Sequence, residues 1–295
     1  MGYQVERLND YVVQLTIPGV DEALGWNKRF LWQSDQHWDS KKTRRDLLKR
    51  HLSEAMECDA PIFFFGDWFD AMQGRSDRRG SKSDVRKEFQ SISYFDDLVD
   101  EAAEWLAPYA SNIAGWSLGN HETSVLLHHE TNLVKRTIDK IRYETGELIE
   151  PMGYEGYILL NFTRADGRAI DGGKKKVFFN HGSGGGGRVS KGVTKTLQIA
   201  ASHPDADIVL QGHTHKYWAV PEPRVRITSQ GRQYTDIQWH LQMSTYKDPY
   251  RNATGLGWEI EKGFGPVAPG SFWTRFQRTP SHGKVKLEII PELAL

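Results

Sequence analysis

Short apolar runs alternate with longer amphipathic stretches along the first two thirds of the chain. The runs are rich in β-branched and aromatic residues and stop at glycine or polar residues, as buried strands do. The clearest run is Ile62–Phe65, which ends at Gly66 and Asp67. The same pattern predicts strands over residues 11–17, 29–33, 113–118, 154–161, 176–180 and 207–211.

The amphipathic stretches between these runs predict helices. From residue 41 to residue 58, apolar side chains recur every three or four positions opposite basic ones, and Asp39 or Ser40 offers an N-cap. Similar spacing predicts helices over residues 84–107, 123–143 and 189–202. After residue 216 short alternating runs with Gly and Pro turns predict further strands. This order of elements is typical of an α/β sandwich.

The strand-like runs share polar side chains at their C-terminal ends. These are oxygen and imidazole donors, with no cysteine thiolate among them. Asp35 and His37, and again His213 and His215, are two residues apart, so that an extended backbone directs both side chains of a pair to one side. Because α/β sheets bind ligands beyond the carboxyl ends of their strands, we expect these donors to converge on metal. The expected ligands are Asp35, His37, Asp67, Asn120, His181, His213 and His215.

Seven donors exceed the needs of one ion that keeps an open position, and they suit two ions sharing a carboxylate. Such a pair lowers the pKa of a bridging water, holds a phosphoryl group by two oxygens and stabilises the charge of in-line attack. Manganese is the first expectation, and Fe, Zn, Ni or Mg accept the same donors. His121 adjoins Asn120, so we expect it to donate a proton to the phosphate or leaving group, oriented by Asp70 or Glu122. His121 and Asp70 are therefore the expected catalytic residues.

Five sequence blocks between about residues 30 and 220 together resemble the calcineurin-like metallophosphoesterase superfamily. They are Asp35-Gln36-His37, Gly66-Asp67-Trp68-Phe69-Asp70, Gly119-Asn120-His121-Glu122, Asn180-His181-Gly182 and Gly212-His213-Thr214-His215. The resemblance implies a four-layer α/β/β/α sandwich with two metals, and His121 near the leaving group. It places Asp35, His37, Asp67 and His215 on one metal, and Asp67, Asn120, His181 and His213 on the other.

The blocks also bear on the branch of the superfamily. Its protein Ser/Thr phosphatases carry an arginine directly after the last Asp of the second block, where this chain has Ala71. The complete His-x-His and Gly-Asp-x-x-Asp blocks look more like the phosphodiesterase and Mre11-like nuclease branches. We expect hydrolysis of phosphodiesters of nucleotide or nucleic-acid type by a metal-bound hydroxide. The alternatives are a phosphomonoesterase, less readily a protein phosphatase, and a non-catalytic scaffold on the same fold.

Three segments offer contacts to such a substrate. Residues 73–87 are polar and basic, residues 182–187 are rich in glycine, and residues 247–251 combine aromatic and basic side chains. Residues 73–87 are more simply a solvated loop, and a flexible connector explains residues 182–187 equally well. The expected substrate contacts are Arg75, Arg188, Tyr250 and Arg251.

The length and composition of the chain limit the number of domains, the charged partners and the location that we expect. The 295 residues are expected to form one domain, with the motif core at about 30–220 and strands of the second sheet at about 221–295. Lys plus Arg equals Asp plus Glu at 38 each, so a nucleic acid would need a local basic patch. The lone Cys58 fits a reducing compartment, and no apolar run reaches the roughly 20 residues of a membrane span. We therefore expect a cytoplasmic protein without membrane contact.

Overall fold

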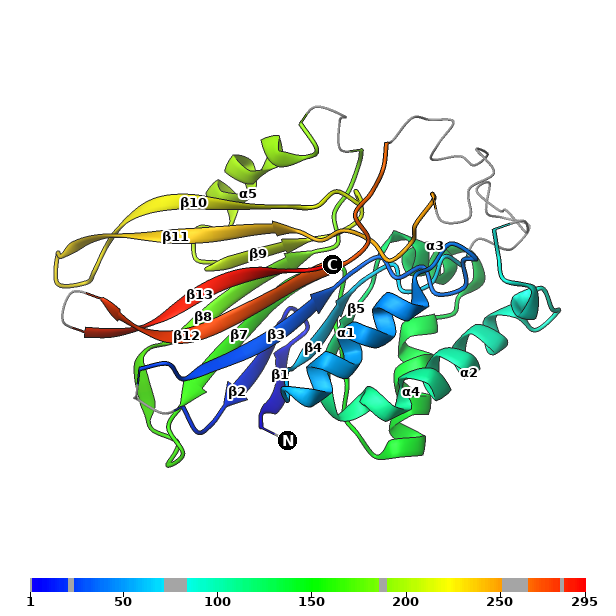
Figure 1. Ribbon diagram of the computed structural model, residues 1–295, viewed down its shortest axis with the longest axis horizontal. Helices are drawn as coiled ribbons and strands as arrows, with labels where there is room; N and C mark the ends of the chain where they lie inside the picture. Colours follow the sequence, from blue (N-terminus) through cyan, green and yellow to red (C-terminus); the bar gives the residue numbers. More distant parts are fainter. Residues whose placement is uncertain (1, 21–23, 72–83, 186–189, 251–264, 282–283) are drawn as a thin grey trace.

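The computed structural model describes residues 2–20, 24–71, 84–185, 190–250, 265–281 and 284–295. Two β-sheets stack, with helices on the outside (Figure 1). The first sheet has the spatial order β13 (Lys284–Ala294), β12 (Ser271–Ser281), β3 (Asn27–Gln33), β4 (Ile62–Phe65), β5 (Ile113–Ser117) and β6 (Glu150–Pro151). The second has the order β1 (Gln4–Asn9), β2 (Val12–Ile17), β7 (Glu155–Thr163), β8 (Ala169–Asn180), β9 (Ile208–Gln211), β11 (Gln233–Gln242) and β10 (Trp218–Ile227).

Strand β4 shows how one short apolar run builds two cores. Ile62 and Phe64 pack against α1 (Arg45–Glu57), α2 (Tyr94–Leu106) and α4 (Leu133–Thr145). Phe63 and Phe65 point the other way and pack between the sheets. This alternation is the two-residue period of a strand that is buried on both faces.

On the outer face of the second sheet, Ile199 of α5 (Thr196–Ser202) packs beside Phe178 and Val209. The layers are therefore α/β/β/α, which confirms the predicted fold class. No described helix combines the length and apolar character that a membrane crossing requires.

Several predicted boundaries were wrong. Helix α1 begins at Arg45, because Asp39 instead accepts hydrogen bonds from the Asp70 and Ala71 amides. The helix predicted over residues 84–107 is the 3-10 turn η1 (Lys87–Phe89) followed by α2.

The later helices are also shorter than predicted. The stretch 123–143 is divided into α3 (Asn120–His129) and α4, and the described part of 189–202 is the 3-10 turn η3 (Val193–Lys195) followed by α5. Another 3-10 turn, η2 (Ala107–Asn112), joins α2 to β5.

The strands after residue 216 divide between the sheets. β10 and β11 extend the second sheet beside β9, whereas β12 and β13 pair with β3 in the first. This differs from the expectation that they all belong to the second sheet.

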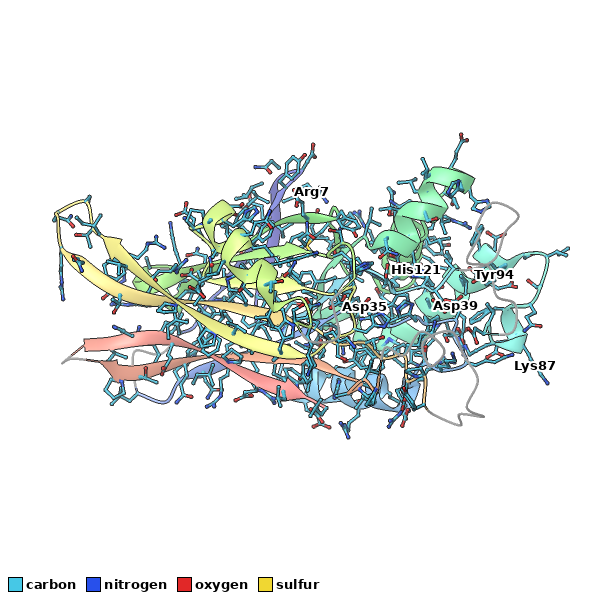
Figure 2. The ribbon with its side chains drawn as sticks, turned by 90° about the horizontal axis from the view of Figure 1, so that it is seen from above. Arg7, Asp35, Asp39, Lys87, Tyr94 and His121 are labelled. Atoms are coloured by element: carbon cyan, nitrogen blue, oxygen red, sulfur yellow. The ribbon has the colours of Figure 1, made fainter. Side chains whose placement is uncertain are left out.

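The parallel strands β3, β4 and β5 of the first sheet end at one edge, and β8 and β9 of the second sheet end next to them. In Figure 2 the labelled Asp35 lies near the middle of the molecule, and His121 and Asp39 lie next to it on the side of the helices. The predicted donors follow these strand ends.

Candidate metal centre

Six of the seven predicted ligands lie on loops, several with unusual backbone geometry, and Asn120 is the first residue of α3. Five of the seven have a positive φ: Asp35 at 56°, His37 at 49°, Asp67 at 52°, His213 at 69° and His215 at 54°. A non-glycine residue in this region costs on the order of 1–3 kcal/mol and persists only where the surroundings enforce it. Strained residues of this kind cluster at functional sites, which supports a site here.

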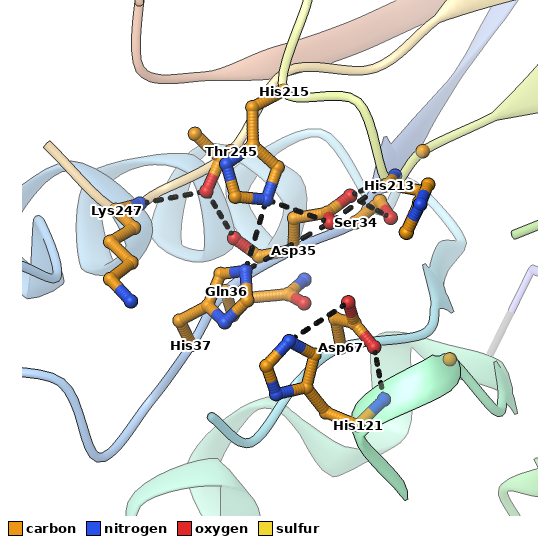
Figure 3. A network of polar contacts seen from close by, with 12 residues as sticks. Ser34, Asp35, Gln36, His37, Asp67, His121, His213, His215, Thr245 and Lys247 are labelled. Carbon is orange, nitrogen blue, oxygen red and sulfur yellow. Dashed lines mark hydrogen bonds and ion pairs between the residues drawn. The ribbon is translucent and has the colours of Figure 1, made fainter. Parts of the chain in front are cut away.

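Asp35, His37 and His215 form a first group of donors, with their ligand atoms within 4.8 Å of one another. His215 Nε2 is 3.1 Å from Asp35 Oδ1 and 3.1 Å from His37 Nε2 (Figure 3). Asp35 is fully buried, and its Oδ2 accepts hydrogen bonds from Ser34 Oγ at 2.6 Å and from the His213 amide at 2.9 Å. Residues 180 positions apart therefore meet in one group.

Asp67, His181 and His213 form a second group within the same 4.8 Å limit. His181 Nε2 lies 3.1 Å from Asp67 Oδ2, and its Nδ1 faces the Phe65 carbonyl at 2.8 Å. Asn120 belongs with this group, because its Oδ1 is 3.2 Å from His181 Nε2 and 2.7 Å from His213 Nδ1. The amide oxygen adds a donor without adding charge.

The charges of these buried groups favour ionised carboxylates. Burial opposes the charged form of Asp67, but His181 and His121 outweigh it and hold the pKa of Asp67 well below its usual value. Burial likewise opposes protonation of His181, yet the carboxylates of Asp67 and Asp35 raise the pKa of His181 to about 10. The carboxylate charge that keeps a proton on His181 would also attract a metal cation in its place.

The donor chemistry fits divalent cations. Carboxylate oxygens, one amide oxygen and imidazole nitrogens converge, which suits Mn, Fe, Zn, Ni or Mg. Because the Phe65 carbonyl can only accept, it fixes His181 Nδ1 as a donor, so Nε2 is the nitrogen that would bind a cation in exchange for its proton. A backbone or carboxylate partner of this kind is the usual support of a metal-binding histidine.

Asp67 is held from several sides. Glu122 accepts hydrogen bonds from the amides of Asp67 and Gly119, both at 2.9 Å, and from the Phe69 amide at 3.0 Å. The His121 amide donates to Asp67 Oδ1 at 2.9 Å. Burial and the neighbouring Asp67 raise the pKa of Glu122 to about 7. The first turn of α3 thus fixes the loop after β4.

His121 lies beside the second group. Its Nδ1 contacts the backbone carbonyl of Asp70, and its Nε2 is 3.8 Å from Asp67 Oδ2. Since a carbonyl only accepts, Nδ1 carries the hydrogen and Nε2 faces the site. Glu122, the other expected partner, bonds backbone amides instead.

Asp70 contacts a predicted ligand more closely than it contacts His121. Its Oδ1 is 2.9 Å from His37 Nδ1 and 3.8 Å from His121 Nδ1. Burial opposes the charged form of Asp70, but Lys247 and His37 hold its pKa well below the usual value. The carboxylate therefore orients His37, while the Asp70 carbonyl orients His121.

Of the expected substrate contacts, the structure describes only Tyr250, which is 41% exposed. Arg75, Arg188 and Arg251 lie outside the described residues. Their roles remain predictions.

Sequence reasoning missed the groups that support the donors. Lys247 and Asp39 are buried beside Asp70, and neither belongs to a block of the resemblance. The sequence placed Lys247 in a segment expected to contact substrate and offered Asp39 as a helix N-cap, and nothing in it marked either residue as a partner of Asp70. Their role comes only from long-range contacts.

Two similar solved structures are Vps29 from Entamoeba histolytica complexed with zinc, and a protein from Streptococcus pneumoniae described as a predicted phosphoesterase. The first is 13% identical, with 89% of this chain and 98% of that chain covered and a TM-score of 0.34. The second is 12% identical, with 91% and 98% covered and a TM-score of 0.33. No curated protein matches the chain.

The family model described as calcineurin-like phosphoesterase matches residues 28–217, which is more than half of the chain. The match spans all five blocks and the loops that carry the donors. The chain therefore belongs to the calcineurin-like phosphoesterase family.

Proposed function

We propose that this protein is a hydrolase that uses two divalent cations to cleave phosphodiesters of nucleotide or nucleic-acid type. The observation that carries the proposal is the pair of donor groups, Asp35–His37–His215 and Asp67–His181–His213. Membership of the phosphoesterase family supports a phosphoester as the substrate. Asp67 is the candidate for a shared ligand, because its Oδ2 lies 3.1 Å from His181 Nε2 of the second group and the charge of His37, from the first group, also lowers its pKa.

When bound, the cations would supply Lewis acidity and an activated water for in-line attack on phosphorus. The protein's own part is to keep the donors fixed and to move a proton. His121 Nδ1 keeps its hydrogen on the Asp70 carbonyl and Nε2 faces the site, so in the doubly protonated ring Nε2 is placed to give its proton to the leaving oxygen and return to the neutral form. Asn120 limits the negative charge around the cations.

Ala71 argues against a protein phosphatase, because this buried residue offers no guanidinium where those enzymes carry an arginine. The preference for a diester rests on the likeness of the His-x-His and Gly-Asp-x-x-Asp blocks to the phosphodiesterase and nuclease branches. Paired assays on bis-nitrophenyl phosphate and nitrophenyl phosphate test this choice. A larger kcat/KM on the monoester would make the protein a phosphomonoesterase.

The metal requirement is tested by stripping the protein with a chelator and adding back Mn²⁺, Zn²⁺, Fe²⁺, Ni²⁺ or Mg²⁺. Activity should return, and Mn²⁺ should restore the most. Asp67→Asn and His213→Ala should each lower kcat/KM by more than about 100-fold, since even partners of metal ligands are worth 10–100-fold. The exposed His128 gives the control variant His128→Ala, which should keep full activity.

Two results would contradict the proposal. Unchanged turnover in Asp67→Asn would remove the site from the reaction. A protein that takes up no cation and hydrolyses no ester would instead be a scaffold on this fold. Among active outcomes, cleavage of oligonucleotides with binding that weakens steeply in salt would favour a nuclease over a hydrolase of small nucleotides.

A further inference from the structure

Lys247 is a buried lysine beside the metal centre, on the loop that follows β11. Its side chain is 9% exposed, and its Nζ lies 2.8 Å from Asp70 Oδ2. The long stem therefore crosses the interior to reach one carboxylate oxygen. A buried ammonium is expensive to desolvate, so such a pair indicates a role beyond surface solubility.

The backbone around Lys247 is tied to the loop that carries Asp35. The Tyr246 amide donates to the Asp35 carbonyl at 3.0 Å, and Thr245 Oγ1 donates to the same carbonyl at 2.7 Å. On the other side, the Arg44 amide donates to the Tyr246 carbonyl at 2.8 Å. These bonds fix the position from which the Lys247 side chain starts, and Figure 3 shows Thr245 between Asp35 and Lys247, whose amide donates to Thr245 Oγ1 at 3.0 Å.

Asp70 connects Lys247 to two functional histidines. One oxygen of its carboxylate accepts from Lys247, the other accepts from His37 Nδ1 at 2.9 Å, and its backbone carbonyl accepts from His121 Nδ1. Its amide donates to Asp39 Oδ1 at 2.6 Å. Every polar atom of Asp70 is thus engaged.

The contact between Lys247 and Asp70 Oδ2 decides which histidine ring hydrogen-bonds to the Asp70 carboxylate. With Lys247 in place, Oδ1 lies within hydrogen-bond distance of His37 Nδ1, whereas His121 Nδ1 is 3.8 Å away. Because Asp70 accepts, His37 Nδ1 carries the hydrogen and His37 Nε2 presents its lone pair towards Asp35 and His215. Without Lys247, the carboxylate is free to turn towards His121.

We propose that Lys247 is a positioning residue, which acts through the Asp70 carboxylate to hold His37 in its cation-binding tautomer. The inference rests on the proposed function for the cation that His37 would bind, and on geometry for the orientation of the His37 ring. It also explains why a third group of donors, His37, Asp70 and His121, needs no cation of its own. The Lys247 ammonium already supplies the positive charge there.

The first test is direct observation of the His37 ring in metal-free protein by long-range ¹H–¹⁵N NMR. Lys247→Met should change His37 from the Nδ1–H form to a mixture of tautomers. Lys247→Arg, which keeps the cation, should restore most of the original signal. Lys49→Met, at an exposed lysine of α1, is the matched control and should change nothing.

The second test is calorimetric titration with Mn²⁺. Lys247→Met should weaken binding by about tenfold, at the lower end of the range for partners of metal ligands. The loss should disappear in an Asp70→Asn background, because Lys247 acts through that carboxylate. Circular dichroism and thermal unfolding of each variant ensure that only folded proteins are compared.

A folded Lys247→Met protein with unchanged His37 signals and unchanged Mn²⁺ affinity would overturn the inference. An equal loss of Mn²⁺ affinity on Lys247→Met in the parent and in the Asp70→Asn background would also overturn it. Failure of the proposed function would look different: no variant, and not the parent protein, would hydrolyse an ester, while the tautomer and Mn²⁺ effects of Lys247→Met would still appear.

Discussion

At Gly119 the absence of a side chain decides whether Asp67 fits beside α3. A Cβ at this position would lie 2.1 Å from Asp67 Oδ1 and 2.3 Å from the Asp67 amide nitrogen. Neither group can yield, because Glu122 and His121 hold both of them. We therefore predict that Gly119→Ala displaces Asp67 and weakens Mn²⁺ binding by more than about tenfold, measured by calorimetry.

Gly153→Ala is the matched control for this prediction. Its Cβ would meet only the Glu155 carbonyl oxygen, at an ordinary contact distance of 3.5 Å. Mn²⁺ affinity should be unchanged in this variant. Parent-like affinity in Gly119→Ala would show that Asp67 does not depend on this close approach.

Single residues were predictable where their chemistry and their place in the chain both carried information. Asp35 and His215 were expected together because both follow apolar runs, and they lie 3.1 Å apart. Lys247 and Asp39 were not predictable, since the contacts that define them join residues 177 and 31 positions apart. The sequence therefore indicates the candidate metal-binding side chains, but not the buried residues that hold them in place.

At the scale of elements, the first turn of α3 supports the loop after β4 through Glu122. Removing its carboxylate leaves the amides of Asp67, Phe69 and Gly119 without their acceptor. We predict that Glu122→Ala lowers the free energy of unfolding by at least about 2 kcal/mol, measured by urea denaturation. The exposed Glu57 offers the control Glu57→Ala, which should stay within about 0.5 kcal/mol of the parent. A loss no larger than the control's would mean that α3 does not brace the loop.

The break between α3 and α4 shows where helix prediction failed and why. The apolar spacing continues across residues 123–143, but Glu130 adopts a left-handed conformation at φ 52° and ends α3. The side chain of Asn132 then caps α4 by accepting from the Lys135 amide at 2.9 Å. The asparagine at position 132 is a residue type that often caps helices, whereas nothing in the sequence indicates that Glu130 is left-handed.

Most substitutions lower the free energy of unfolding, but the backbone conformation of Glu130 predicts that a glycine at this position raises it. Glycine adopts the left-handed region without the penalty of about 1–2 kcal/mol that other residues have. Glu130→Gly should therefore raise the free energy of unfolding by about 0.5 kcal/mol after the entropy of the unfolded chain is included. Leu127→Gly, at an exposed position within the same helix, should lower it by about 1 kcal/mol. Urea denaturation of both variants measures the contrast, and a loss at Glu130→Gly would contradict it.

At the scale of the whole molecule, the candidate metal centre depends on the meeting of two sheets. β3 and β4 of the first sheet bring Asp35, His37 and Asp67, while β8 and β9 of the second bring His181, His213 and His215. The α/β class and the meeting of strand ends were predictable from apolar runs. The division of the C-terminal strands between the sheets was not, because β10 to β13 share one alternating pattern and only pairing distinguishes them.

Two buried histidines outside the metal centre couple the stability of the whole molecule to pH. His51 lies 2.8 Å from the Tyr246 hydroxyl, and burial together with Arg50 lowers its pKa to about 4. His240 lies 3.0 Å from Gln238 Oε1, and burial together with Arg224 lowers its pKa to about 4. Between pH 4 and about 6.5 the unfolded chain binds protons at these two positions that the folded chain does not. Their contribution to stability is therefore complete above about pH 6.5 and is lost as the pH falls towards 4.

The comparison between parent and variant isolates this effect. The pKa of Glu122, raised to about 7, acts in the opposite sense over part of this range, so the slope of the parent alone is not diagnostic. In chelator-treated protein, thermal unfolding from pH 4 to 7 should show a smaller loss of Tm on acidification for His51→Gln/His240→Gln than for the parent. Each single variant should lie between, because the two sites are on separate elements, α1 and β11, and should contribute additively. Parallel curves for parent and double variant would mean that both histidines already take up protons in the folded state, and that acid sensitivity arises elsewhere.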